Sequence, residues 1–551
     1  MPERKGPVEG MIEESYSITG GDYETAGLAS SRLKERLKKI GLEPSLMRRI
    51  MIAAYEAEMN VVIHAVRGTM RVILRDRHLD MEVLDEGPGI KDIPLAMQRG
   101  YSTAPRIARE MGFGAGMGLP HIQKSSDFFR IESVVGSGTS VRIKINLKTQ
   151  EDASNRTSSS LTVKAELCRK CLRCLHPCPT RAIRLHGDRP IVLGHLCIDC
   201  TACIQVCPSG VFTIDCESSV PTPPEGAVLV VPASLFFQFE RGTGTEQVAA
   251  ALGALGFQRI VSIEGWESAL RDAVSGYAGK PATPLPVISP VCPAIVTLIE
   301  TRFPSLIPYL APFLSPAEAA LRELAPPAPF LMVACPSQAA AVRSGSSKTE
   351  PKIVSPDAVI RAILPLLSGT IARCNLTMTY GPGATFPLRE ASPLQELSGN
   401  SKVVKILTVS GVLPVIRVLE QVENGILKDV PILEPFACQG GCFGSPLMRE
   451  DPCIARYRRD RWPHVPFTPA TAVPREAPYR VRSGLRLHTD MGEAIARLSR
   501  IDRLIRELPG RNCGVCGAPT CEALAEDVVL GRASKSDCAF LEKSEGKPPC
   551  N

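Results

Sequence analysis

Twenty cysteines dominate the chemistry that this 551-residue sequence can support. None precedes Cys168, and nine fall in the stretch from Cys168 to Cys216. Within that stretch the spacing C-x2-C-x2-C-x3-C-P occurs twice, starting at Cys168 and at Cys197. Three thiolates within seven residues can wrap one face of an inorganic cube, and the proline turns the chain away. In a reducing cytosol this clustering indicates metal or iron–sulfur chemistry rather than disulfides, with zinc as the alternative.

The duplicated spacing resembles that of the bacterial two-cluster ferredoxins, in which the fourth cysteine of each run ligates the other cluster. The resemblance implies two [4Fe–4S] clusters. The ligands of the first would be Cys168, Cys171, Cys174 and Cys207. The ligands of the second would be Cys197, Cys200, Cys203 and Cys178. Cys216 lies outside both runs and is interpreted as a small apolar residue.

A second set of residues could bind a nucleotide. Apolar residues at helical spacing predict a helix over 45–66, on which Glu56 and Asn60 project from one face because they are four positions apart. An extended run is expected at 71–84. Three glycine-containing segments follow it, namely 85–89 (DEGPG), 112–118 (GFGAGMG) and 136–139 (GSGT). Any one of them could be an ordinary turn of an α/β domain, but their order favours a nucleotide pocket.

This order resembles the GHKL ATPases, and most closely the anti-sigma-factor and stress-switch serine/threonine protein kinases. The resemblance implies that ATP and Mg²⁺ bind here, with Asn60 as a magnesium ligand and Asp85 as the acceptor for the adenine amino group. Glu56 would be the general base for an attacking hydroxyl. Glycines would let the backbone approach the purine and would form a phosphate-binding lid. The remaining nucleotide-binding residues would be Gly87, Gly89, Gly112, Gly114, Gly116, Gly118 and Thr139.

Two alternatives concern the activity of this domain. Related domains also bind ATP without acting as kinases, so phosphoryl transfer is a separate expectation from nucleotide binding. A histidine kinase is disfavoured, because its phosphoacceptor histidine would lie on a preceding helix and no histidine occurs before His64. His64 itself is interpreted as a packed helix residue.

The sparse cysteines of the stretch 226–453 lie in contexts that resemble the active-site domain of the large subunit of iron-only hydrogenases. The contexts are 289–293 (SPVCP), 333–338 (VACPSQ) and 434–442 (EPFACQGGC), and residues 248–270 look like that family's helix–strand opening. The resemblance implies that four cysteines hold a [4Fe–4S] cubane, one of them bridging to a two-iron site. The matching residues are Cys292, Cys335, Cys438 and Cys442.

The surroundings of that site depart from the family pattern. Val291 stands where a cysteine relays protons, Gln338 where a lysine pairs with a cyanide ligand, and Phe436 where a methionine adjoins the two-iron site, although Glu434 is retained. Valine cannot titrate and an amide cannot neutralise an anion. A retained cubane without hydrogen turnover is therefore expected, and a metal-free domain with buried thiols is the alternative.

The last cysteine group follows a predicted helix at 491–508. Its spacing C-x2-C-x4-C, with a fourth cysteine after sixteen intervening residues, resembles the small Fe–S module of electron-transport-complex subunits and corrinoid Fe–S proteins. The resemblance implies another [4Fe–4S] cluster, with a zinc knuckle as the alternative. Its ligands would be Cys513, Cys516, Cys521 and Cys538. Among the remaining cysteines, Cys374 and Cys453 are interpreted as structural and Cys550 as free.

Polar and proline-rich breaks at 148–160, 218–226 and 456–479 separate these chemistries into four expected domains. The predicted fold class is multidomain α/β and α+β. The domains would be a GHKL (Bergerat) α/β sandwich over 1–147, a ferredoxin-type α+β domain over 162–217, a hydrogenase-like α/β domain over 226–453 and a small helical Fe–S module over 485–551.

Composition narrows the functional classes. Apolar residues make up 44% and charged residues 22%, as in ordinary globular chains. The net charge of +7 is spread along the chain without a basic, aromatic-rich patch, so nucleic acid is not a leading partner. No apolar run approaches the roughly 18 residues of a membrane span. The first ten residues lack the apolar core of a signal peptide, so a cytoplasmic protein is expected.

Together these features predict a redox- or hydrogen-responsive regulator, similar to the sensory branch of iron-only hydrogenases. Cluster state would alter ATP binding, or the phosphorylation of a serine or threonine on an anti-sigma-antagonist-type partner. One alternative is an electron-transfer subunit that serves a separate hydrogenase or oxidoreductase. Another is an active iron-only hydrogenase that tolerates altered surroundings.

Overall fold

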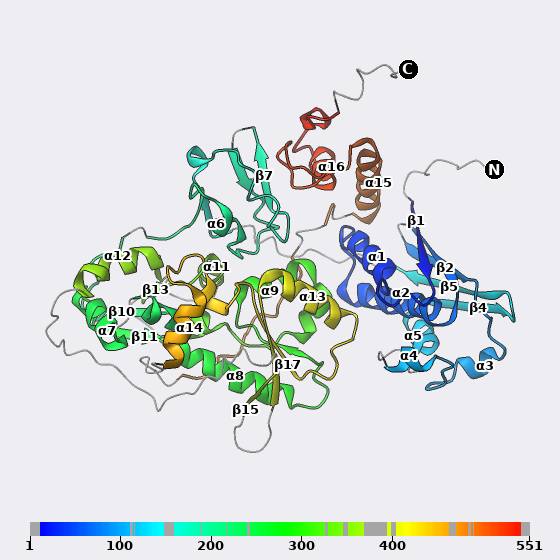
Figure 1. Cartoon of the computed structure of the whole chain (residues 1–551), viewed down its shortest axis with the longest axis horizontal. Helices are drawn as coiled ribbons and strands as arrows, with labels where there is room; N and C mark the ends of the chain where they lie inside the picture. Colours follow the sequence, from blue (N-terminus) through cyan, green and yellow to red (C-terminus); the bar gives the residue numbers. More distant parts are fainter. Residues whose placement is uncertain are drawn as a thin grey trace. The chain divides into compact units, whose positions relative to one another are not determined.

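The computed structural model describes residues 11–541 with internal gaps (Figure 1). The gaps are 76, 111–113, 115, 148–158, 188, 218, 240–242, 325–328, 345–350, 368–393, 398–403, 462–469, 483–485 and 489. The chain divides into two compact units. The first combines 1–154 with 483–512 and 520–551, and the second combines 155–482 with 513–519. The expected division into four domains stays a prediction.

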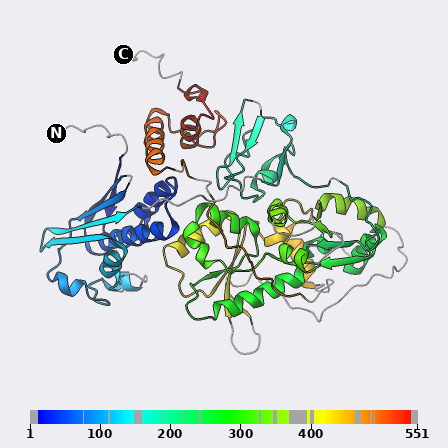
Figure 2. The same cartoon turned by 180° about the vertical axis from the view of Figure 1, so that it is seen from behind.

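The first unit contains an antiparallel five-stranded sheet in the order β1-β2-β3-β5-β4. Figure 2 shows this sheet and its neighbouring helices from behind. The strands are β1 (Ile12–Thr19), β2 (Arg67–Leu74), β3 (His78–Asp85), β4 (Phe128–Val134) and β5 (Gly138–Asn146). Alternate residues of β1, β2, β3 and β5 are buried, as period-two strands with one covered face require. This arrangement confirms the predicted α/β sandwich.

Helices α1 (Leu28–Lys38) and α2 (Pro44–His64) contact this sheet, and α5 (Gly118–Ser125) contacts α2 and β4. Pro44 begins α2 at a position where a missing N–H costs nothing, and Ile50, Ala53 and Ala57 form its buried face. Two short helices, α3 (Ile93–Ala96) and α4 (Arg106–Glu110), precede α5.

The extended run predicted at 71–84 is divided in the structure. It belongs to two strands, β2 and β3, and a tight turn in which the Arg75 N–H donates to the His78 carbonyl at 3.0 Å connects them. The polar residues Arg75 and Arg77 favour such a turn over a continuous strand. The first unit also contains α15 (Met491–Glu507), close to its predicted range, α16 (Cys521–Val529) and the short helix η5 (Lys535–Asp537).

The described residues of the ferredoxin-type part of the second unit form two small two-stranded sheets and two short helices. β6 (Leu161–Val163) pairs with β9 (Phe212–Ile214), and β7 (Ile183–His186) pairs with β8 (Arg189–Val192), both antiparallel. η1 (Ala165–Leu167) and α6 (Ala202–Val206) precede cysteine ligand candidates. The backbone of β7 also contacts the 513–519 segment, where the Leu185 N–H donates a hydrogen bond to the Gly517 carbonyl at 2.8 Å.

The hydrogenase-like part has two sheets. The first is parallel, in the order β11-β10-β13-β14, and the second has the order β12-β17-β16-β15. The strands of the first are β10 (Val228–Val231), β11 (Arg259–Ser262), β13 (Phe330–Met332) and β14 (Lys352–Val354). Those of the second are β12 (Val287–Ile288), β15 (Leu394–Leu397), β16 (Val404–Ser410) and β17 (Ile432–Phe436). β10 is buried along its whole length, as a parallel strand covered on both faces should be.

Helices surround these sheets (Figure 1). They are α7 (Thr245–Ala254), α8 (Glu264–Ala278), α9 (Pro293–Arg302), α10 (Pro316–Glu323), α11 (Pro336–Ser344), α12 (Pro356–Leu367), α13 (Val412–Glu423) and α14 (Pro452–Arg461), with the short helices η2 (Ala233–Phe237), η3 (Pro304–Tyr309) and η4 (Gly441–Gly444). None of the helices described in the chain is both long and apolar enough to cross a bilayer.

The segment 456–479, expected to mark a break between domains, carries structure in its described parts. α14 extends to Arg461, and Tyr479 donates its hydroxyl to the carbonyls of Ala311 (3.0 Å) and Phe313 (2.9 Å). The Leu314 N–H donates to the Val473 carbonyl at 2.9 Å. The described backbone of this segment thus pairs with the hydrogenase-like part, and the break expected from its prolines and basic residues stays a prediction.

Candidate functional site

The predicted nucleotide residues Glu56 and Asn60 lie on α2, where the start of α5 approaches them. A Cβ at Gly118 would lie 3.2 Å from Asn60 Oδ1 and 3.3 Å from Glu56 Oε2, so only glycine fits without displacement. Asn60 Nδ2 is buried and has no hydrogen-bond partner among the described residues. An unsatisfied buried donor is costly, so this atom fits a site completed by a ligand.

Asp85 ends β3 and joins the neighbouring loops. Its Oδ1 accepts hydrogen bonds from the N–H groups of Gly87 (2.9 Å) and Thr139 (3.2 Å). Burial raises the pKa of Asp85 above its ordinary value, and these hydrogen bonds oppose that rise. The structure thus brings Thr139 beside Asp85, as the predicted site requires.

Two glycines near Asp85 allow close approaches within the chain itself. Gly89 has a φ of +70°, and a Cβ there would lie 2.3 Å from the Val134 carbonyl oxygen. A Cβ at Gly138 would lie 1.9 Å from the Asp85 carbonyl oxygen. These glycines therefore let the chain's own backbone segments approach one another, whereas the sequence interpretation assigned Gly87 and Gly89 to contact with the purine.

The described part of the glycine-rich lid packs against residues 100–104. Gly114 (φ +77°) leaves room for Ala104, since a Cβ would lie 2.3 Å from that residue's own Cβ. Gly116 (φ +71°) lies against Tyr101, and its carbonyl accepts a hydrogen bond from the Gly100 N–H at 2.9 Å. Gly112 lies outside the described residues.

The sequence interpretation missed two residues of this region. His121, one turn into α5, has its Nδ1 2.9 Å from Glu56 Oε1 and so fixes that carboxylate. Glu58 is buried, and its carboxylate accepts hydrogen bonds from the N–H groups of Ala29 (3.0 Å) and Ser30 (2.8 Å) at the start of α1. A carboxylate at a helix N-terminus is favourable, but only the tertiary structure places α1 there. The sequence signal that could have indicated His121 was its place three positions after Gly118.

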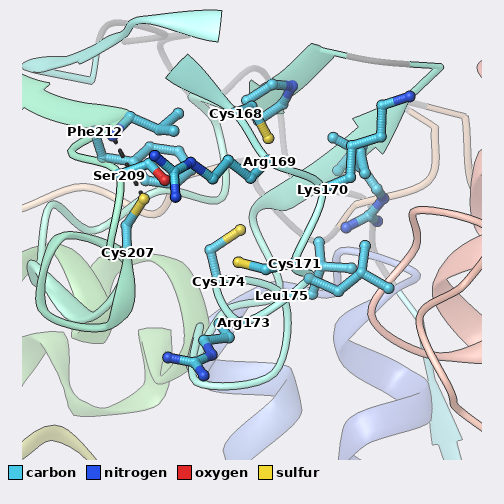
Figure 3. Close-up of a pocket in the computed structure, with 15 residues that line it drawn as sticks. Cys168, Arg169, Lys170, Cys171, Arg173, Cys174, Leu175, Cys207, Ser209 and Phe212 are labelled. Atoms are coloured by element: carbon cyan, nitrogen blue, oxygen red, sulfur yellow. Dashed lines mark hydrogen bonds between the residues drawn. The ribbon is translucent and has the colours of Figure 1, made fainter.

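The first predicted cluster site is a cavity in the ferredoxin-type part (Figure 3). Cys168, Cys171, Cys174 and Cys207 all line it, and Figure 3 shows the last of them entering from the separate segment after α6. Burial raises the pKa of Cys174 to about 11, and the nearby thiols of Cys207, Cys168 and Cys171 add to the rise. Negative thiolates this close need a cationic centre, which fits an iron–sulfur cluster.

The second predicted set also converges. Burial raises the pKa of Cys203 to about 12, and the nearby thiol of Cys178 adds to the rise. The pKa of Cys200 lies well above its ordinary value for the same two causes. N–H groups point at two of the sulfurs, from Ala182 to Cys178 at 3.2 Å and from Asp199 to Cys197 at 3.4 Å. The four thiols that the ferredoxin spacing pairs are thus near one another.

The two cysteine runs share an unusual backbone geometry. Lys170 and Leu172 flank Cys171 with φ of +53° and +61°, and Asp199 and Thr201 flank Cys200 with φ of +53° and +69°. Side chains other than glycine rarely adopt this left-handed conformation, which costs about 1–2 kcal/mol per residue. The same strain at matching positions indicates that it serves the placement of the central cysteine.

In the hydrogenase-like part the four predicted cysteines follow strands of both sheets. Cys292 precedes α9, Cys335 joins β13 to α11, Cys438 follows β17 and Cys442 lies in η4. Burial raises the pKa of Cys335 to about 12, with added effects of Cys438 and Cys292. Burial likewise raises the pKa of Cys442, and the other three thiols contribute. The structure therefore brings the four together, which fits a cubane.

This site adjoins the ferredoxin-type part. The Thr201 hydroxyl lies 3.9 Å from Cys438 Sγ. Cys200 and Cys292 pack against the same apolar cluster, which contains Ile198 and Ala437. The second ferredoxin set and the four-cysteine site are therefore neighbours within one unit.

The residues that depart from the family pattern are also placed. Val291 packs against an apolar cluster that includes Val287 and Ile432. The amide oxygen of Gln338 accepts a hydrogen bond from the Ala334 N–H at 2.7 Å. Glu434, 2% exposed, pairs with Arg271 through two hydrogen bonds of 2.7 and 2.9 Å. Phe436 ends β17 and adjoins Gly441.

The remaining cysteines have varied surroundings. In the last group, Cys513 and Cys516 belong to the second unit, and Cys521 and Cys538 to the first. Cys521 begins α16, and its N–H donates to Asn512 Oδ1 at 2.8 Å. Cys538 is buried. Among the other cysteines, Cys216 packs partly buried, Cys453 is exposed, and Cys374 and Cys550 lie outside the described residues.

Within the residues that the structure describes, no three cysteine, histidine, aspartate or glutamate side chains lie close enough to bind a single metal ion. The thiols of the first ferredoxin set line one cavity. Four thiols around a space suit a cluster of several atoms.

Four family models match separate parts of the chain. Residues 21–145 match the histidine kinase-like ATPase domain, and residues 167–212 match the 4Fe-4S dicluster domain. Residues 228–322 match the C-terminal domain of the iron only hydrogenase large subunit, which includes Cys292 but not the other three cysteines of that site. Residues 508–540 match an Fe-S cluster family.

Curated relatives resemble the N-terminal part. The anti-sigma F factor of Clostridium acetobutylicum is 32% identical over 118 residues, which is 20% of this chain and 79% of the relative. The serine/threonine-protein kinase RsbT of Bacillus subtilis is 32% identical over 109 residues, which is 19% of this chain and 76% of the relative.

Among solved structures, a variant of the [FeFe]-hydrogenase HydA1 from Chlamydomonas reinhardtii aligns with 44% of this chain and 85% of its own, at 13% identity and a TM-score of 0.33. The family resemblances expected from the motifs are thus confirmed by the four models. The chain belongs, through its N-terminal domain, to the family of the anti-sigma F factors, and the same polypeptide carries ferredoxin-type, iron-only-hydrogenase-like and Fe–S domains.

Proposed function

We propose that this chain is an iron–sulfur regulator whose N-terminal domain transfers a phosphoryl group from ATP to a serine or threonine of a partner protein, under the control of cluster state. The observation that carries the proposal is the junction of α2 and α5, where Glu56, Asn60 and His121 meet at Gly118. The anti-sigma relatives support a partner of the anti-sigma-antagonist type.

In this reaction Glu56 accepts the proton of the attacking hydroxyl, and His121 holds the carboxylate in place. A bond forms between the hydroxyl oxygen and the γ-phosphorus, the bond from that phosphorus to the β–γ bridging oxygen breaks, and ADP leaves. Asp85 accepts a hydrogen bond from the adenine amino group. Asn60 would hold Mg²⁺, which offsets phosphate charge when bound.

The proposal assigns the ligands of up to four [4Fe–4S] clusters, which exchange single electrons when bound. Three sets are complete within the second unit. They are Cys168, Cys171, Cys174 and Cys207; Cys197, Cys200, Cys203 and Cys178; and Cys292, Cys335, Cys438 and Cys442. A fourth set is predicted from spacing and from the match at 508–540, and consists of Cys513, Cys516, Cys521 and Cys538.

The test is ATP-dependent labelling of an anti-sigma-antagonist-type protein by the anaerobically purified full chain, with its clusters oxidised or reduced. Glu56→Gln should abolish labelling while leaving nucleotide binding, because the carboxylate acts on the hydroxyl rather than on ATP. Glu132→Gln, an exposed carboxylate on β4, is the matched control and should label normally. Labelling that survives in Glu56→Gln, or that is equal in both redox states, would contradict the proposal.

A second function, electron transfer to a separate oxidoreductase, is favoured by the contact of Thr201 with Cys438. Adjacent clusters at these positions would form a continuous relay. Reduction of an acceptor dye at the same rate with and without ATP would support this function over regulation. Infrared bands of CO and cyanide on matured protein would instead indicate a two-iron site and would support the hypothesis that the chain is an active hydrogenase.

A further inference from the structure

The C-terminal end of α1, within the first unit, carries two cations that meet acidic residues far along the chain. Arg36 Nη1 donates to Asp502 Oδ1 on α15 at 2.6 Å, and a second guanidinium nitrogen contacts the other carboxylate oxygen. Lys39 Nζ donates to Glu522 Oε1 on α16 at 2.6 Å and also contacts Glu526. Basic residues at the end of α1 thus meet acidic residues of α15 and α16 within the same unit.

These pairs are largely shielded from solvent. The side chain of Lys39 is 11% exposed and that of Arg36 is 20% exposed. Burial alone would lower the pKa of Lys39, but Glu526 and Glu522 together raise it above its ordinary value. Two carboxylates around one shielded ammonium group form a specific contact, unlike exposed surface pairs, which contribute little.

The backbone reinforces this contact. The Leu487 N–H donates to the Lys39 carbonyl at 3.0 Å, and Leu487 is buried. Gly41, with a φ of +75°, lets the Arg486 side chain lie against the chain, since a Cβ there would be 2.5 Å from Arg486 Cδ. Side-chain and backbone contacts therefore hold the same end of α1.

The other end of α1 is joined to the nucleotide site. Glu58 accepts the N–H groups of Gly27, Ala29 and Ser30, which lie at and just inside the start of α1. Glu58 is on α2, between Glu56 and Asn60 in sequence. A rigid helix with both ends bound can transmit a change of position from its C-terminal end to this turn of α2.

The acidic partners lie next to a predicted cluster ligand. Cys521 is the first residue of α16, Glu522 is the second, and Glu526 is one turn further. Thr520 caps this helix by accepting the Ala523 N–H at 3.1 Å. Any change in the coordination of Cys521 therefore acts on the turn that presents Glu522 to Lys39.

We propose that the C-terminal end of α1, with the cations of Arg36 and Lys39 and the adjoining Gly41, is the docking surface for α15 and α16. This docking couples the C-terminal Fe–S module to the nucleotide site. The inference rests on the proposed function, which leaves open the cluster that controls the N-terminal domain. It assigns that role to the set containing Cys521.

The test uses the full chain, prepared anaerobically, with hydrogen exchange and Mg·ADP affinity as the two readouts. Lys39→Glu places a carboxylate against Glu522 and Glu526, and should increase exchange in 486–490 and in α16. Mg·ADP affinity should fall about fivefold or more, the lower range of typical coupling between sites. Lys39→Glu combined with Glu522→Lys and Glu526→Lys should restore both readouts, which separates docking from misfolding.

Arg142→Glu is the matched control, because it makes the same charge change at an exposed pair with Glu82 on the sheet. It should leave both readouts unchanged. Unchanged exchange of α16 in Lys39→Glu would overturn the docking surface. Increased exchange with unchanged Mg·ADP affinity would overturn the coupling.

Cys521→Ser tests the cluster link in the same preparation. It should lower the iron content and reproduce the exchange pattern of Lys39→Glu, and a loss of iron with α16 still protected would overturn that link. Neither readout needs phosphoryl transfer. A chain that docks and binds Mg·ADP but labels no partner would therefore contradict the proposed function while leaving this inference standing.

Discussion

In the ferredoxin-type part, three ligands of each proposed cluster lie within seven residues, whereas the four cysteines of the hydrogenase-like part extend from Cys292 to Cys442. The first arrangement is set by a short backbone segment with left-handed residues on either side of Cys171 and Cys200. The second depends on two sheets that deliver Cys335 and Cys438 from separate strands. The same thiol chemistry is thus specified locally in one part and by the tertiary fold in the other.

The two parts also differ in the apolar core that supports them. Among the described residues, the buried apolar cluster of the ferredoxin-type part has five members, including Ile183 and Phe212. One cluster of the hydrogenase-like part has 23, built around β10 and β13. Small domains bury too little apolar surface to be stable alone. The ferredoxin-type part should therefore depend on its clusters for folding. The hydrogenase-like part should depend on its apolar core.

Removal of iron should give the largest effect and would test this difference directly. Treatment of the loaded protein with a chelator under reducing conditions should abolish hydrogen-exchange protection in β6–β9, because metal binding supplies folding free energy to small domains. Protection in β10 and β13 should persist. Equal loss of protection in both parts would remove the distinction.

Arg271→Ala should destabilise the second unit by about 3–5 kcal/mol, because it leaves the buried Glu434 carboxylate without its partner. Glu434 lies in β17, four residues before Cys438, so this pair supports the strand that delivers a thiol. Denaturant unfolding measures the effect. Arg361→Ala, which breaks an exposed i,i+4 pair with Asp357, is the control and should cost about 0.5 kcal/mol or less.

Tyr479→Phe should cost about 0.5–1.5 kcal/mol, because the carbonyls of Ala311 and Phe313 lose the hydroxyl donor that they share, while the Ala311 carbonyl keeps the Phe313 N–H as a donor. The result would sharpen the comparison by showing that the tertiary part extends past residue 453. Thermal unfolding of the full chain checks it, with the exposed Tyr457→Phe as the control. A change no larger than that of the control would show that the 470–482 segment contributes little.

Lys170→Gly should give the smallest effect, a gain of a few tenths to about 1 kcal/mol. Relief of the left-handed conformation returns about 1–2 kcal/mol, and the greater freedom of glycine in the unfolded chain offsets about 0.5–1 kcal/mol. Arg169→Gly, at a neighbouring position without positive φ, should only destabilise. Equal signs for the two variants, measured by denaturant unfolding, would mean that local strain does not define this site.

Much of the organisation could be predicted from the printed sequence. The fold classes and family resemblances followed from spacings, and the helix that carries Glu56 and Asn60 was expected within two residues of its observed ends. The glycines around Asp85 were expected to let the backbone approach the purine, and that contact stays a prediction. Gly89 and Gly138 face carbonyl groups of the chain itself, and no local pattern predicts which distant backbone will approach.

Spacing by itself determined which thiols and carboxylates could act together, because i,i+4 positions on a helix and close cysteines on a loop share a fixed local geometry. Only the tertiary structure decided that His121 holds Glu56, that Glu58 binds the start of α1, and that Lys39 meets Glu522. These contacts join residues tens to hundreds of positions apart. They form because burial of apolar faces brings the elements together, and that packing depends on the whole fold rather than on any single segment.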